Sequence, residues 1–142
     1  MNAQAQPAAD FLHLARSSFI DAFAAVERSV CARLQSLGAE VHGSFGQRME
    51  VLRAIEASPR YSKADRGAVH QHLEKLEKLN AVRCDVVHSQ LYVVRTDGEI
   101  HSCFINPSAR EEFCSTARVV SNSQFEAMTK ELGRIAKGLA PR

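Results

Sequence analysis

The sequence lacks several features that would place it in a class at once. It has no apolar run near the roughly 18 residues that a membrane-spanning helix needs. Its first ten residues have neither the basic nor the apolar region of a secretory signal peptide, since they read MNAQAQPAAD. We therefore expect a cytoplasmic protein with no membrane partner.

Cysteine is scarce and widely spaced. The four cysteines form no CxxC pair and no zinc-type spacing; they are Cys31, Cys84, Cys103 and Cys114. In a reducing compartment such residues are most simply packed thiols. The sequence also lacks a glycine-rich phosphate loop, a GxSxG elbow, an HExxH pair and a paired-carboxylate pattern. We expect no disulfide framework, no metal and no cofactor.

The sequence also has no large excess of charge of either sign. Eighteen Lys and Arg face sixteen Asp and Glu, and a net charge of +2 is too mild to predict a nucleic-acid binder by its field alone. Apolar residues make up 45% and charged residues 24%, an ordinary globular balance that argues against disorder. With no repeat or low-complexity linker, the 142 residues predict a disordered lead-in over 1–9 and a single domain over 10–142.

Four segments have the apolar spacing of amphipathic helices. In the first, Asp10 can cap the start and Gly38 stands where a left-handed residue is expected. Each of the other three opens with a serine and a polar partner at capping-box spacing. The predicted helices cover about 10–37, 44–59, 62–90 and 121–139.

The pattern changes after the third helix. Residues 91–105 place β-branched and aromatic residues on both sides of Asp97-Gly98, the signal of a type I′ hairpin. Pro107 is expected to end the hairpin, followed by a short helical turn around AREEF and an extended ARVV. The predicted fold is mainly α, a helical bundle of about four helices with an inserted β-hairpin near 91–105.

Arg83 and His88 stand near the end of the third predicted helix. Five positions on an ideal helix correspond to roughly 140° of separation, whereas residues of one site usually stand three or four apart. Either the pair is structural, or the helix end loosens, or the pair belongs to a site that one helix alone does not complete.

The setting of this pair is more specific than the pair itself. Asn80 stands three residues before Arg83, a hairpin follows, and a second long helix precedes. This assembly resembles the HEPN family (higher eukaryotes and prokaryotes nucleotide-binding), small α-helical bundles whose hallmark is Arg-x4-6-His near the end of a helix. The family often has N-x-x-R-N-x-x-x-H, and this chain has N-A-V-R-C-D-V-V-H.

The resemblance implies a metal-independent endoribonuclease that acts as a homodimer, with the motif helices of two chains lining one cleft. Arg83 and His88 would be its catalytic residues. An imidazole titrates near neutrality and suits proton transfer, and a guanidinium can stabilise the charge that develops on the phosphate. Attack by the 2′-OH of RNA would leave a 2′,3′-cyclic phosphate.

Three neighbours of the pair have supporting roles under this resemblance. Asn80 could bind the phosphate or fix Arg83, Asp85 could orient His88 or an opposing arginine, and Cys84 replaces the family's usual polar residue. Their structural readings are a polar surface residue, a surface carboxylate and a packed thiol. A toxin or defence effector with an antitoxin or regulatory partner would fit this activity. The alternative function is a non-catalytic HEPN-like module that binds nucleotide or RNA, or dimerises.

Overall fold

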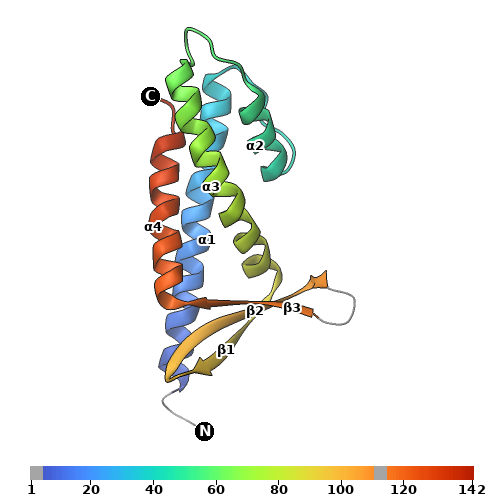
Figure 1. Ribbon diagram of the computed structural model, residues 1–142, viewed down its shortest axis with the longest axis vertical. Coiled ribbons are helices and arrows are strands. Elements are labelled where there is room, and N and C mark those ends of the chain that lie inside the picture. Colours follow the sequence, from blue (N-terminus) through green and yellow to red (C-terminus); the bar gives the residue numbers. More distant parts are fainter. Residues whose placement is uncertain (1–4, 111–114) are drawn as a thin grey trace. The chain divides into compact units, whose positions relative to one another are not determined.

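The computed structural model describes residues 5–110 and 115–142, with side chains for 10–107 and 116–142. Its elements, in chain order, are α1 (Ala5–Ser36), α2 (Phe45–Ala54), α3 (Lys63–His88), β1 (Gln90–Thr96), β2 (Glu99–Arg110), β3 (Ser115–Ser121) and α4 (Asn122–Leu139) (Figure 1). The described residues thus form a mainly helical protein with a small sheet, which confirms the predicted fold class at this level.

The chain divides into two compact units. The sheet unit comprises Met1–Asp21 with Asn80–Lys130, and the helical unit comprises Ala22–Leu79 with Glu131–Arg142. Helices α1, α3 and α4 each supply residues to both units.

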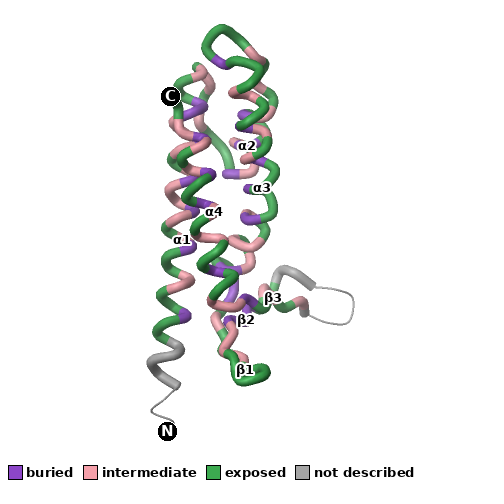
Figure 2. The backbone as a smooth tube through the Cα atoms, turned by 60° about the vertical axis from the view of Figure 1, so that its left-hand side comes forward, coloured by how far each residue is buried: buried purple, intermediate pink, exposed green. Residues whose placement is uncertain are grey.

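The core of the helical unit is made of the predicted apolar stripes. In this unit α2 lies beside α3, and buried positions line the helices on their inner sides (Figure 2). The ring of Phe23 in α1 meets the ring of Phe45 in α2 edge to face, with centroids 5.3 Å apart. The buried apolar side chains of this unit are Phe23, Val26, Val30, Leu34, Phe45, Met49, Leu52, Tyr61, Val69, Leu73, Leu76, Leu79, Leu132, Ile135 and Leu139.

Most predicted helix ends are confirmed, but the expected end of the second helix at Pro59 is wrong, because Ile55 is already extended and α2 ends at Ala54. In three caps the serine hydroxyl accepts a hydrogen bond from the backbone N–H three residues on, in the pairs Ser44–Gln47, Ser62–Asp65 and Ser121–Gln124. Gly38 has a φ of +75°, and the Ala39 N–H donates to the Leu34 carbonyl, so α1 ends as predicted.

The start of α1 differs from the prediction. The helix begins at Ala5, so Asp10 lies inside it and does not cap it. Alanine favours helix and proline is tolerated in a first turn, which explains why AQPAAD continues the helix. Residues 1–4 of the predicted lead-in lie outside the described residues.

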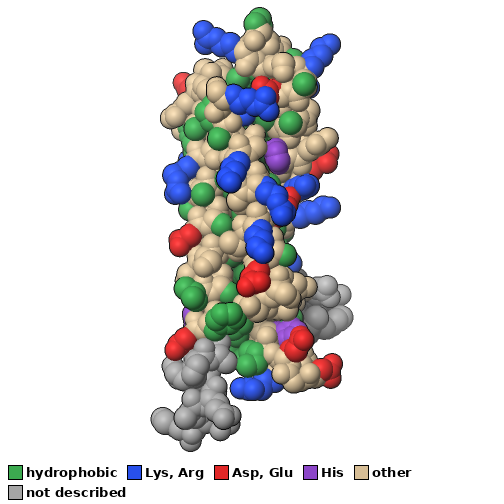
Figure 3. Space-filling model, turned by 90° about the vertical axis from the view of Figure 1, so that its left-hand side faces the viewer, with side chains coloured by type: hydrophobic (Ala, Val, Ile, Leu, Met, Phe, Trp, Pro, Cys, Tyr) green, Lys and Arg blue, Asp and Glu red, His purple; other side chains and the backbone are tan. Residues whose placement is uncertain are grey.

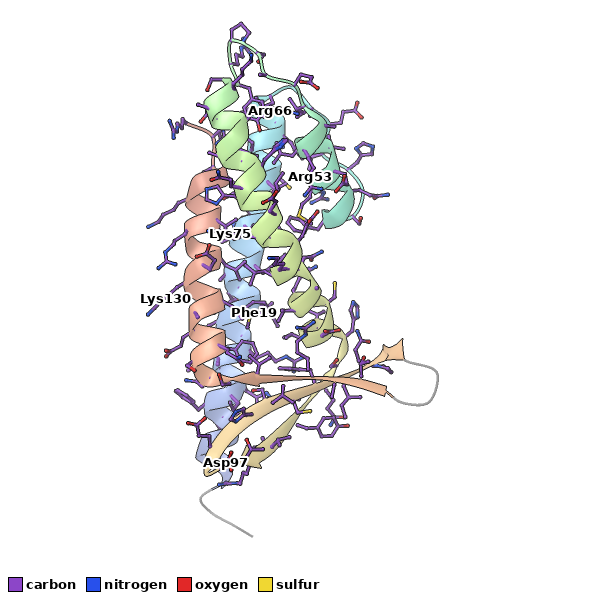
Figure 4. All side chains as sticks on the ribbon, viewed as in Figure 1. Phe19, Arg53, Arg66, Lys75, Asp97 and Lys130 are labelled. Atoms are coloured by element: carbon purple, nitrogen blue, oxygen red, sulfur yellow. The ribbon has the colours of Figure 1, made fainter. Side chains whose placement is uncertain are left out.

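The predicted hairpin is confirmed. Asp97 and Gly98 have φ values of 49° and 78°, which a type I′ turn requires, and Thr96 pairs with Glu99 across the two-residue loop. Asp97 marks the tip of this hairpin in Figure 4. The sheet is antiparallel with the order β1-β2-β3.

The expectation that Pro107 ends the hairpin is wrong. Strand β2 continues to Arg110, and its pairing with β3 shifts register between Ile105 and Arg110. Proline cannot donate to a strand ladder, and an irregularity at that point lets pairing resume beyond it. The start of the expected AREEF helical turn is therefore strand, and its remainder lies outside the described residues. The extended ARVV is confirmed within β3.

One face of the sheet is packed within the sheet unit. Phe104 of β2 meets Phe125 of α4 edge to face, with ring centroids 5.9 Å apart, and Phe125 meets Phe19 of α1 at 5.7 Å. Phe104 pairs in register with both Leu91 and Arg118, so these three side chains share a face. The inner face of the sheet therefore has an apolar centre and an arginine on its β3 side.

Candidate functional site

The end of α3 is held in place by an arginine from α1. Arg16 donates from Nη2 to the carbonyls of Val86 and Ser89, at 2.7 and 3.2 Å, and its guanidinium lies 5.7 Å from the Phe104 ring centroid. These carbonyls belong to the last turn, where a helix leaves acceptors without intrahelical partners. As a result α3 stays helical through His88.

The regular end of α3 excludes one of the three explanations for the spacing of Arg83 and His88, namely that the helix end loosens. Because α3 does not loosen, the two residues keep roughly the 140° separation of an ideal helix. Arg83 is half-buried and His88 is exposed. His88 makes no hydrogen bond or ion pair with another described residue. The structure therefore does not bring the two side chains together on one face of α3.

Asp85, between them, is bonded to the sheet. Its carboxylate accepts a hydrogen bond from Arg118 Nε at 2.7 Å and another from Asn106 Nδ2 at 3.1 Å. Burial alone raises the pKa of Asp85, but the bonds from Arg118 and Asn106 and the charge of Arg118 hold that pKa below its ordinary value. Asp85 thus contacts an arginine of its own chain, and both carboxylate oxygens have partners other than His88.

Cys84 is exposed, so the expectation of a packed thiol is wrong. Val82 and Val86 continue the apolar stripe of α3, and Cys84 stands two residues from each, about 200° round the helix. The apolar stripe, extended through the motif, would therefore have predicted that Cys84 faces solvent. The same holds for His88, which stands four residues later on the same side of the helix. Of the other cysteines, Cys31 is half-buried and Cys103 is buried, whereas Cys114 lies outside the described residues.

Asn80 is half-buried at the start of the motif. Its Oδ1 atom is buried and has no hydrogen-bond partner among the described residues. That oxygen therefore accepts no bond from Arg83 here.

The structure adds two residues that sequence reasoning missed, Arg118 and Asn106. Together with Asp85 and four neighbours they line a cavity of about 380 Å³ in the sheet unit, here called the Arg118 pocket, whose lining is Asp85, Phe104, Asn106, Thr116, Ala117, Arg118 and Val119. The sequence carries no local signal for this pocket, because its walls come from α3, β2 and β3 and meet only through the strand register.

Positive and negative side chains are intermixed on the surface. Lys and Arg side chains are spread over the face shown in Figure 3, with Asp and Glu side chains among them. Among the described residues, no group of three or more His, Cys, Asp or Glu side chains is arranged to hold a metal ion.

Two further findings bear on classification. None of the helices in the described part of the chain has the length and apolar character that a bilayer crossing requires. Comparisons with protein-family models, with curated proteins and with solved structures gave no match to this chain.

Proposed function

We propose that this chain is a metal-independent endoribonuclease of the HEPN type that acts as a homodimer. One observation carries the proposal: His88 is an exposed imidazole without a partner among the described residues, at the end of a helix that Arg16 holds in place. A general acid or base must be accessible to its substrate and held by a rigid element, and His88 meets both requirements.

The chemistry follows from the two residue types. A neutral His88 takes the proton of a 2′-OH, and the 2′-oxygen attacks the adjacent phosphorus. The 5′-oxygen leaves and takes a proton from an imidazolium, which leaves a 2′,3′-cyclic phosphate and a 5′-OH. Arg83 stabilises the negative charge on the non-bridging oxygens, since a guanidinium is always cationic and donates two parallel hydrogen bonds.

A cleft between two chains reconciles this chemistry with the helix geometry. Arg83 and His88 lie on different sides of α3, so one helix cannot direct both at a single phosphate. In a two-fold dimer, Arg83 of one chain and His88 of the partner chain can line the same cleft.

The activity test uses purified protein in excess EDTA. Single-stranded RNA should be cleaved to cyclic phosphate ends, and DNA of the same sequence should be spared because it has no 2′-OH. His88→Ala should slow cleavage by at least about 10²-fold, the usual contribution of general acid–base catalysis. His13→Ala is the matched control, because His13 is also exposed in the sheet unit and lies on α1. Equal activity of the two variants would refute the role of His88.

Arg83→Ala should reduce the cleavage rate by a similar factor. The double variant should be scarcely slower than either single variant, because the effects of substituting residues that act as a unit are not additive. Cys84→Ser should keep most of the activity. Wild-type protein that binds RNA without cleaving it would leave the non-catalytic HEPN-like module as the function.

A mixing test examines the two-chain cleft separately. Equal amounts of Arg83→Ala and His88→Ala protein are unfolded and refolded together. If Arg83 and His88 come from different chains, half of the refolded dimers have one intact site of two, and about one quarter of wild-type activity returns. A site within one chain would give no recovery in this mixture.

A further inference from the structure

The Arg118 pocket contains a guanidinium that is fixed on one side and open on the other. Arg118 donates to Asp85 through its Nε atom, and its two terminal nitrogens make no hydrogen bond with any described residue. The side chain is 37% exposed while it lines the cavity. A guanidinium held in this way presents its terminal N–H groups in a fixed direction, as the recognition of a phosphate requires.

The rest of the pocket lining suits a polar, anionic ligand. Asn106 and Thr116 contribute an amide and a hydroxyl from either side of the sheet irregularity, and Phe104 and Val119 contribute apolar wall. Among the described residues of the lining, Asp85 is the only other charged group, and it has one oxygen bonded to Arg118 and the other bonded to Asn106. Arg118 is therefore the group that would meet a ligand's negative charge.

The pocket also lies next to the proposed catalytic histidine. Asp85 forms part of its wall and stands three positions before His88, so their β-carbons are about 5–6 Å apart on the same helix. A strand that places one phosphate beside His88 can reach Arg118 with a neighbouring phosphate.

We propose that the Arg118 pocket binds a phosphate of the RNA strand next to the scissile one, with Asp85 as the residue that positions Arg118. This inference rests on the proposed function for the identity of the strand. The binding itself needs no cleavage, so the two proposals can fail separately.

The test measures binding of a short, fluorescently labelled 2′-O-methyl RNA, which keeps the phosphates but has no free 2′-OH to attack. Arg118→Gln should weaken binding about tenfold, the value of one charge-assisted hydrogen bond. It should also lower the salt dependence by about 0.7 in slope, the contribution of one phosphate contact to a single strand. Arg95→Gln is the matched control, because it removes the same charge from an exposed position on β1, and Kd should change by less than about twofold there.

Asp85→Asn distinguishes positioning from net charge. Removing a negative charge should tighten the binding of RNA if only the overall field mattered. Loss of the Arg118 anchor should instead weaken it. Tighter binding by Asp85→Asn, or an unchanged Kd for Arg118→Gln, would overturn the inference even if the protein cleaves RNA.

A folding control and a competitor complete the design. Arg118→Lys keeps the charge, but a single ammonium cannot hold Asp85 and meet a phosphate in the fork geometry of arginine, so binding should weaken here too at unchanged thermal stability. A free 5′-mononucleotide should compete only weakly. Competition by the mononucleotide at the affinity of the oligonucleotide would assign the pocket to a free nucleotide and refute the strand subsite. In the cleavage assay, Arg118→Gln should raise KM and leave kcat nearly unchanged.

Discussion

Two glycines of α4 should respond in opposite ways to the same substitution. A β-carbon at Gly138 would lie 2.7 Å from both Cδ2 and Cε1 of His72 and closer still to its Nε2, whereas a β-carbon at Gly133 would meet nothing within 4 Å. The backbone near Gly138 cannot readily move away, because Arg33 donates to the carbonyls of Leu139 and Ala140 at 2.8 and 2.7 Å. The half-buried ring of His72 must therefore yield.

The magnitudes follow from helix propensity and overpacking. Gly133→Ala should stabilise the protein by about 0.5–1 kcal/mol, the difference between glycine and alanine inside a helix. Gly138→Ala gains little of this near the helix end and should destabilise the protein by about 1–2 kcal/mol, because inserted methyl groups in packed regions cost about 1–3 kcal/mol. The melting temperatures should then differ by several degrees, at about 2–4 °C per kcal/mol for a chain of this size.

The assay is urea unfolding followed by circular dichroism, with thermal melts as a second measure. His72→Ala should make room, so Gly138→Ala in that background should no longer destabilise, and a double-mutant cycle gives the coupling. The reasoning fails if both alanine variants stabilise the protein equally, or if the effect at Gly138 persists without the imidazole.

Three further outcomes can be measured on the intact chain. Gly98→Val should lower the melting temperature, because the type I′ turn holds this residue at a φ of 78° that β-branched side chains resist. Arg16→Ala should lower the free energy of unfolding by about 1–3 kcal/mol, since it leaves part-buried carbonyls unpaired, and should speed amide exchange in the last turn of α3. The folded pKa of Asp85 lies below its ordinary 3.8, so its ion pair stabilises the fold above that pH and is lost as pH falls through the lower value. Acid titration of Asp85→Asn should therefore lack this loss, and an identical acid profile in both proteins would contradict the assignment.

The features that the sequence predicts well are local. A serine and its capping partner stand three residues apart, and the Asp97-Gly98 turn is specified by its own two residues. The apolar stripes likewise need only the helical period. Each of these structures is stabilised by groups close together in the chain, so a single sequence contains the information.

The features that sequence reasoning missed depend on distant residues. Three helix C-termini are held by an arginine from another element. Arg16 bonds the end of α3, and Arg33 bonds the end of α4. Arg66, labelled in Figure 4, bonds the carbonyl of Ile55 after α2. Nothing local distinguishes these arginines from those on the surface. The Arg118 pocket and the third strand depend in the same way on pairing between β2 and β3, which resumes beyond a proline that by itself predicts an end.

The motif could be predicted from the sequence only in part. The Asn80, Arg83 and His88 pattern is visible in the sequence, and so is its place near the end of a helix. The partners of Asp85 could not be predicted, because they lie on strands that follow the motif by about 20 to 30 residues.

The bonds from Arg16 to the end of α3 also affect the order in which the sheet unit forms. They join residues 70 and 73 positions apart, and contacts of this separation close a long loop, so they form after the local turns of helix. A refolding chain therefore has most of α3 before its final turn is fixed. We therefore expect the last turn of α3, which carries His88, to reach its native state only after the N-terminal part of α1 has docked against it.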